Sequence, residues 1–175
     1  MSLQAVPANL DQAWAGLRDL QHACHESAKS KGFHDDAVRL GRALKSVEAL
    51  GLDETDDIRQ VLETAVRDRT GNRLMLIVGE LAEAHEELRA GRLPAEEYVS
   101  YPQSLVDEIG VDAAAQQFAD RGLTPKPEGL PSELADVLIR LLEFAEEHKI
   151  DLGDVARRKF RYNAEREMFH GGKRF

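Results

Sequence analysis

The amino-acid sequence predicts an all-α protein, and three observations support this fold class. Apolar side chains recur at helical spacing along nearly every apolar stretch of the chain. No segment shows the alternating β-branched pattern, flanked by turn signals, that is typical of a strand. The 175 residues, 42% of them hydrophobic, suffice for one domain with its own core. We therefore expect a single domain over 1–175 with no β-sheet beyond turns.

Three helical segments are predicted in the first half of the chain. The first spans residues 10–32 and carries its apolar side chains on one face. A short helix follows over 40–50 and is closed by a glycine. A longer helix begins at Asp56, where acidic residues suit a helix N-terminus, and Gly71 is expected to kink or break it.

The second half contains helices separated by a proline-rich stretch. The apolar stripe resumes over 74–90, and five of the six prolines then lie between residues 94 and 131. This stretch is expected to be mostly irregular, with one short helix over 112–120. The remaining helices are predicted over 131–147 and 151–168.

Charge and composition exclude several classes of protein. The chain has 32 acidic and 23 basic residues, so its net charge of −9 argues against broad nucleic-acid binding. Cys24 is the single cysteine, which excludes an internal disulfide. No apolar run reaches the length of a membrane span, and the first residues do not form a signal peptide. We expect a cytoplasmic protein without a nucleic-acid or membrane partner.

Two predicted helices carry acidic pairs at the same spacing. Glu80 and Glu83 are three residues apart, as are Glu133 and Asp136, so each pair places two carboxylates side by side. Such carboxylates repel one another unless a cation lies between them, and hard cations such as Mg²⁺ prefer oxygen ligands. Glu87, one heptad beyond Glu80, is a candidate fifth acid.

This spacing has an ordinary alternative interpretation, because acidic residues three apart often form the solvated face of a helix. The last helix favours the ligand-binding interpretation. Lys159, Asn163 and Arg166 lie on one polar face that is largely cationic, and such side chains bind phosphate. A basic last turn that complements the helix dipole is the alternative for this face.

Together these motifs resemble the MazG-like, all-α nucleoside triphosphate pyrophosphohydrolases. The motifs that carry the resemblance are Glu80-Leu-Ala-Glu83, Glu133-Leu-Ala-Asp136 and Lys159-Phe-Arg-Tyr-Asn163. The stretch from His25 to Phe33 and the tail His170-Gly-Gly-Lys173 are also similar to members from bacteria and phages. The chain departs from compact members in its longer spacer, since 49 residues separate Glu83 from Glu133. Segments 34–70 and 91–130 are accordingly elaborations, the latter an insertion between the acidic helices.

The resemblance implies a MazG-like helical bundle that cleaves nucleoside triphosphates between the α- and β-phosphates, giving a monophosphate and pyrophosphate. The implied cofactor is Mg²⁺, with Mn²⁺ as an alternative. The implied metal ligands are Glu80, Glu83, Glu133 and Asp136. Glu83, as general base, and Lys159 are the implied catalytic residues. The implied substrate-binding residues are Lys159, Tyr162, Asn163 and Arg166, although Tyr162 could pack in the core instead, an alternative slightly favoured over stacking on the base.

Two other functions fit the same sequence. One is a helical assembly module without activity, and the other is a regulatory protein that binds a nucleotide alarmone without hydrolysing it. A homodimer or homotetramer is expected in each case, because the helix over 131–147 has apolar residues around more than one face. The helix over 72–90 is expected to share that interface.

Overall fold

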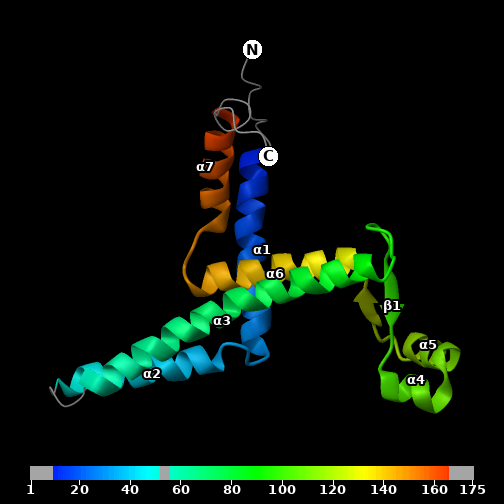
Figure 1. Cartoon of the computed structure of the whole chain (residues 1–175), viewed down its shortest axis with the longest axis horizontal. Coiled ribbons are helices and arrows are strands. Elements are labelled where there is room, and N and C mark those ends of the chain that lie inside the picture. The colour runs from blue at the N-terminus through cyan, green and yellow to red at the C-terminus, as the bar shows by residue number, and fades with distance from the viewer. Residues whose placement is uncertain (1–9, 52–55, 166–175) are drawn as a thin grey trace. The chain divides into compact units, whose positions relative to one another are not determined.

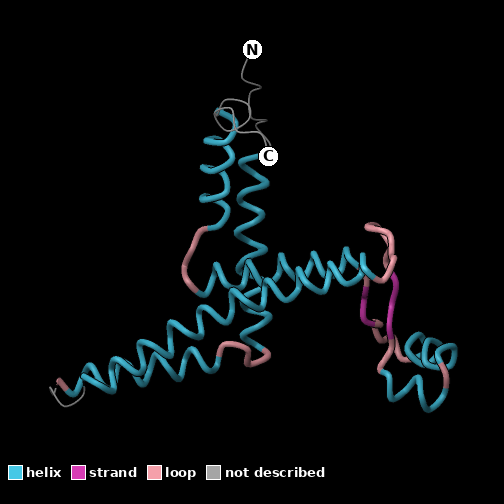
Figure 2. Tube along the Cα trace, viewed as in Figure 1, coloured by secondary structure: helices cyan, strands magenta, loops and turns pink. Residues whose placement is uncertain are grey.

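Helices make up most of the chain in the computed structural model, which describes residues 10–51 and 56–165 (Figure 1). Over these residues the elements are α1 (Leu10–Ser30), α2 (Asp35–Leu50), α3 (Asp56–Arg89), β1 (Tyr98–Ser100), α4 (Gln103–Ile109), α5 (Val111–Asp120), β2 (Lys126–Glu128), α6 (Leu130–Glu147) and α7 (Leu152–Glu165). The predicted helical class is confirmed. The expected absence of a sheet is wrong, since β1 and β2 form a short one (Figure 2).

The elements group into two compact units. The first unit contains α1, α2, α7, the part of α3 up to Arg73 and the part of α6 from Ile139. The second unit runs from Leu74 to Leu138 and contains the rest of α3, the insertion and the start of α6. The prediction of one domain over 1–175 stays a prediction.

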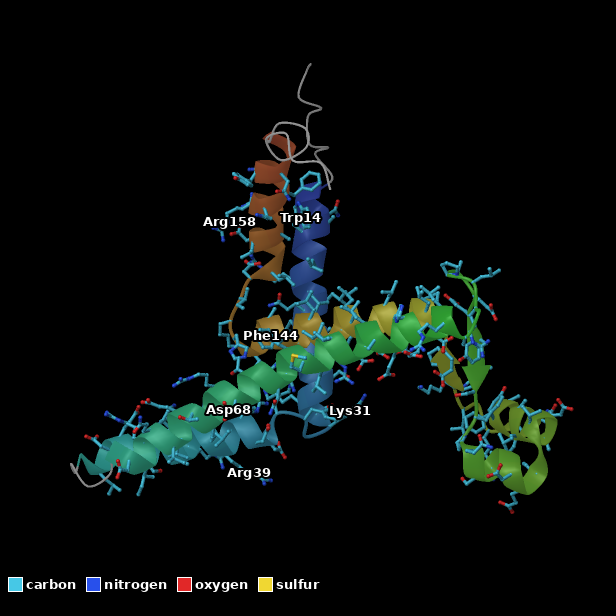
Figure 3. The ribbon with its side chains drawn as sticks, viewed as in Figure 1. Trp14, Lys31, Arg39, Asp68, Phe144 and Arg158 are labelled. Carbon is cyan, nitrogen blue, oxygen red and sulfur yellow. The ribbon has the colours of Figure 1, made fainter. Side chains whose placement is uncertain are left out.

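In the first unit, α1 and α7 approach each other closely. A Cβ atom at Gly153, in the first turn of α7, would lie only 2.6 Å from the carbonyl oxygen of Trp14. The Trp14 ring (Figure 3) lies 6.2 Å from the Phe160 ring, measured between centroids. The buried Gln21 amide donates to Glu146 Oε2 at 2.8 Å and to the Ile150 carbonyl at 2.9 Å. The absence of a side chain at Gly153 and the hydrogen-bonded amide of Gln21 therefore fix the packing of α1 in this unit.

Helix α3 continues through Gly71, so the predicted break is wrong, while the alternative of a kink stays a prediction. Arg69 and Arg73, on either side of this glycine, both reach Glu147 of α6. Arg69 Nη1 lies 2.5 Å from Glu147 Oε1, and Arg73 Nε lies 3.2 Å from Glu147 Oε2. All three side chains are mostly buried. A glycine inside a helix costs about 1 kcal/mol, and ion pairs that bridge its two flanks offset that cost.

The second unit contains more regular structure than the sequence predicts for the insertion. Instead of one short helix in an irregular segment, the structure has α4, α5 and the antiparallel pair of β1 with β2. Ser100 lies opposite Lys126 in that pair. The Tyr101 ring meets the Phe118 ring of α5 edge-on at 5.1 Å, and Ala114 is fully buried. These contacts give the insertion a small core of its own.

The remaining boundaries within the described residues agree with the sequence predictions to within a few residues, except that α2 begins earlier, at Asp35. The predicted end of the last helix, at residue 168, lies outside the described residues. Arg166 and the tail from His170 to Lys173 lie outside the described residues. In the part of the chain that the structure describes, no helix is both long enough and apolar enough to cross a membrane.

Candidate metal centre

Three of the four predicted metal ligands lie together in the second unit. Glu80 is on α3, whereas Glu133 and Asp136 are on α6. One carboxylate oxygen from each lies within 4.8 Å of the other two. Among residues 10–51 and 56–165, no other group of three or more His, Cys, Asp or Glu side chains is arranged closely enough to hold a metal ion. We call Glu80, Glu133 and Asp136 the carboxylate cluster.

The start of α6 fixes the position of Glu133. The Gly129 carbonyl accepts hydrogen bonds from the backbone N–H groups of Ser132 at 2.9 Å and Glu133 at 3.2 Å. Ser132 Oγ donates to the Pro127 carbonyl at 3.0 Å, which ties the helix to β2. Pro131 suits this first turn because its missing N–H needs no partner there. Glu133 therefore lies where the helix dipole favours a negative charge.

Two of the three residues of the cluster are buried, and the cluster carries an excess of negative charge. Glu80 and Glu133 are each only 7% exposed, and Asp136 is less buried. Burial raises the pKa of Glu133, and the charges of Glu83, Asp136 and Glu80 raise it further, while Lys126 opposes them. A divalent cation among these oxygens would replace this repulsion by attraction. The residues present therefore fit Mg²⁺ or Mn²⁺, which accept carboxylate ligands.

Glu83, the fourth predicted ligand, lies beside the cluster rather than in it. Its side chain is exposed, and it does not belong to the group of close carboxylate oxygens. Its charge is nevertheless the second largest cause of the raised pKa of Glu133, after burial. This position at the solvent edge suits a residue that contacts water or substrate rather than one enclosed around an ion.

Glu87, the candidate fifth acid, has a structural role instead. It accepts a hydrogen bond from the Tyr98 hydroxyl at 3.2 Å and lies 3.0 Å from Arg92 Nε. The Arg92 guanidinium in turn lies 3.8 Å from the centroid of the Tyr98 ring. An acid whose charge is balanced in this way holds the end of α3 against β1 and has no need of a metal ion.

The predicted substrate-binding residues that the structure describes lie on α7, in the first unit. Lys159, Tyr162 and Asn163 are all exposed on that helix, and Lys159 Nζ lies 5.2 Å from the centroid of the Tyr162 ring. Tyr162 is 56% exposed, so the slightly favoured core-packing alternative is wrong. The binding roles of these residues, and that of Arg166 beyond the described range, stay predictions.

Lys126 and Glu128 on β2 are charged residues near the cluster that sequence reasoning missed. Lys126 Nζ donates to Glu128 Oε2 at 2.8 Å, and Ser100 Oγ of β1 donates to Glu128 Oε1 at 2.7 Å. Residues two apart share one face of a strand, so the alternation of Lys126, Pro127 and Glu128 was the available signal. It was too short to be distinguished from the surrounding proline-rich sequence.

Comparison with known proteins finds no matching family model, no matching curated protein and no matching solved structure. The three motifs, and the geometry of the residues that they contain, are therefore the basis for a functional proposal.

Proposed function

We propose that this chain is a Mg²⁺-dependent nucleoside triphosphate pyrophosphohydrolase with a MazG-like helical bundle. The observation that carries the proposal is the carboxylate cluster, with its three oxygens within 4.8 Å of one another and two of its members buried. A buried group of like charges is costly to maintain without a cation. These acids belong to an ExxE and an ExxD motif that resemble those of the MazG-like pyrophosphohydrolases. This resemblance is the reason to propose that the cation serves cleavage of a phosphoric anhydride.

In this proposal Glu80, Glu133 and Asp136 hold the metal, which is Mg²⁺ or alternatively Mn²⁺. When bound, a divalent cation neutralises phosphate oxygens and lowers the pKa of coordinated water. Glu83, exposed beside the cluster, orients the attacking water and accepts its proton. Attack on the α-phosphorus in line with the bridging oxygen then releases a nucleoside monophosphate and pyrophosphate. Lys159, Tyr162, Asn163 and Arg166 are the proposed substrate contacts from the last helix.

The same proposal includes a homodimer or homotetramer acting in the cytoplasm, where nucleoside triphosphates are present. Exposed apolar side chains on α3 and α6 support self-association.

The test is product analysis with purified chain, Mg²⁺ and each common ribo- and deoxyribonucleoside triphosphate. We expect a monophosphate and pyrophosphate in equal amounts. Asp136→Asn should lower kcat/KM by about 100-fold or more, because even residues that only support metal ligands contribute about 10- to 100-fold. Glu86→Gln is the matched control, since Glu86 lies on the same helix as Glu80 but is exposed and pairs with Arg89 at 2.8 Å.

Other outcomes identify the alternatives. Release of a diphosphate and inorganic phosphate, or equal activity in Asp136→Asn and Glu86→Gln, would contradict the proposal. Binding of a nucleotide without turnover would favour the regulatory protein. Neither binding nor turnover would favour the assembly module.

A further inference from the structure

We propose that Lys126 of β2 contacts the polyphosphate chain of a nucleotide held at the carboxylate cluster. The insertion between the acidic helices would then supply a substrate-binding cation as well as connecting those helices. This inference rests on the proposed function, which it deepens by assigning a binding residue outside the three motifs.

Lys126 is held in place while its side chain stays accessible. Glu128 accepts its hydrogen bond with one carboxylate oxygen, and Ser100 occupies the other. Ser100 is also the residue opposite Lys126 in the pairing of the two strands, which are drawn in magenta in Figure 2. Glu128, itself held by Ser100, therefore positions the ammonium group. The Lys126 side chain is 67% exposed, whereas that of Glu128 is mostly buried. A mostly buried Glu128 that holds an exposed Lys126 ammonium group in position suits contact with a ligand.

The connection from Lys126 to the cluster is short and constrained. Only six residues separate Lys126 from Glu133 in the chain. Gly129 lies between them with a φ of +100°, and a Cβ atom there would lie 2.4 Å from the Glu96 carbonyl oxygen. Together with the hydrogen bonds that Pro127 and Gly129 accept from the first turn of α6, this close contact ties β2 to the helix that carries Glu133.

The charges around Lys126 favour its ammonium form. The hydrogen bond to Glu128 raises the pKa of Lys126, and the charges of Glu133 and Glu83 raise it further. The ammonium group therefore lies in the electric field of these carboxylates. A polyphosphate that approaches those acids needs cations around it, and a lysine is a compact phosphate ligand.

A purely structural role is the competing explanation, in which Lys126 serves only to pair with Glu128. Exposed ion pairs contribute little to stability. The two explanations also differ in a measurable way. Lys126→Gln and Glu128→Gln break the same ion pair, so a structural role predicts the same effect for both. A phosphate contact predicts loss of affinity for Lys126→Gln, and unchanged or tighter binding for Glu128→Gln, which leaves the ammonium group free.

The experiment is calorimetric titration of the full chain with Mn²⁺ alone, and then with inorganic tripolyphosphate at saturating Mg²⁺. Tripolyphosphate carries the phosphate chain without a base, so base preference does not affect the result. We expect Lys126→Gln to weaken tripolyphosphate binding about tenfold or more, as loss of a charge-assisted hydrogen bond implies. Mn²⁺ binding should be unchanged or tighter, because a positive charge beside the cluster has been removed. Lys126→Arg should restore most of the tripolyphosphate affinity.

Lys29→Gln is the matched control, because Lys29 is an exposed lysine in the first unit that pairs with Glu26 at 3.3 Å. It should change neither titration. Wild-type affinity for tripolyphosphate in Lys126→Gln, or equal loss in Lys126→Gln and Glu128→Gln, would overturn the inference and leave the proposed function standing. A wild-type chain that binds Mn²⁺ but neither tripolyphosphate nor any nucleotide would overturn both.

Discussion

His34 is a buried histidine without a hydrogen-bond partner for either ring nitrogen among the described residues. It is 5% exposed, and its ring centroid lies 4.4 Å from that of His25. Its Nδ1 lies 3.4 Å from Glu147 Oε2, and Arg69 and Arg73 share that carboxylate. Burial lowers the pKa of His34 most; Arg73, His25 and Arg69 lower it further, and Glu147 opposes them. The neutral form of His34 is therefore favoured in the folded chain.

This neutral state predicts a pH dependence of stability. The folded pKa of His34 lies below that of the unfolded chain, so the unfolded chain binds more protons between the two values. The contribution of His34 to the free energy of unfolding is fully present above about pH 6.5, and it is lost as the pH falls below that value. Urea unfolding between about pH 7 and about pH 5 should show a smaller loss of stability in His34→Phe than in wild type. His22→Gln, which changes an exposed histidine, should lose as much stability as wild type over this range. Identical pH profiles for His34→Phe and wild type would contradict the attribution of the pH dependence to His34.

At the scale of single residues, the sequence predicts the acids of the cluster but not the cation beside them. Glu80, Glu133 and Asp136 can be found because helical spacing is local, and a three-residue interval places two side chains on the same side of a helix. The proposed role of Lys126 depends on the pairing of β1 with β2. In that pairing Lys126 lies opposite Ser100, which is 26 residues earlier in the sequence. No local pattern encodes such a pairing. The same holds for His34, whose environment comes from residues of α1, α3 and α6.

Gly129 lies at the junction of β2 and α6, and its replacement tests how these two elements are joined. Alanine there must adopt a positive φ and must also displace the Glu96 backbone, which would lie 2.4 Å from the new Cβ. Gly110 is the matched control, since its φ is +82° but its Cβ would meet no atom within 4 Å. Gly110→Ala should cost about 1–3 kcal/mol of unfolding free energy from backbone strain alone. Gly129→Ala should lower the unfolding free energy by more than Gly110→Ala does, and it should also weaken Mn²⁺ binding. Equal urea unfolding midpoints for the two variants would show that the close contact at Gly129 is absent.

Sequence periodicity predicts the elements well where an apolar face persists over several turns, as in α1, α6 and α7. It fails at Gly71, because the ion pairs that carry α3 through this glycine come from Glu147, which is distant in the sequence. It also fails for β1 and β2, which have only three residues each. Strands of that length cannot display an alternating pattern, and Pro127 in β2 is itself a signal against a strand.

At the scale of the whole molecule, the described chain leaves many large apolar side chains exposed. Leu142 is the one large side chain that is fully buried among the described residues. In the second unit, exposed apolar side chains of α3 include Leu74, Met75, Val78 and Leu81, which recur at helical spacing. Leu134 and Leu138 of α6 are exposed in the same unit. Exposed apolar side chains gathered in this way are typical of interfaces between protein chains.

This surface predicts self-association through α3 and α6. Sedimentation at micromolar concentration should give a dimer or tetramer rather than the 19.5 kDa monomer. Met75→Lys places a charge on a side chain that is 61% exposed and should shift the chain toward the monomer. Leu93→Lys, at an exposed leucine of the loop after α3, is the control and should leave the mass unchanged. A wild-type monomer would contradict the prediction.

The carboxylate cluster should bind a divalent cation, and calorimetric titration with Mn²⁺ measures that binding. Wild type and Glu86→Gln should bind the ion with equal affinity, whereas Glu133→Gln and Asp136→Asn should each bind it at least about tenfold more weakly. Because burial and neighbouring acids raise the pKa of Glu133, its ionised form destabilises the metal-free chain at neutral pH. Glu133→Gln should therefore unfold at the same or a higher urea concentration without metal, which excludes misfolding as the cause. Equal Mn²⁺ affinity in all four proteins, or no binding by wild type, would contradict the claim.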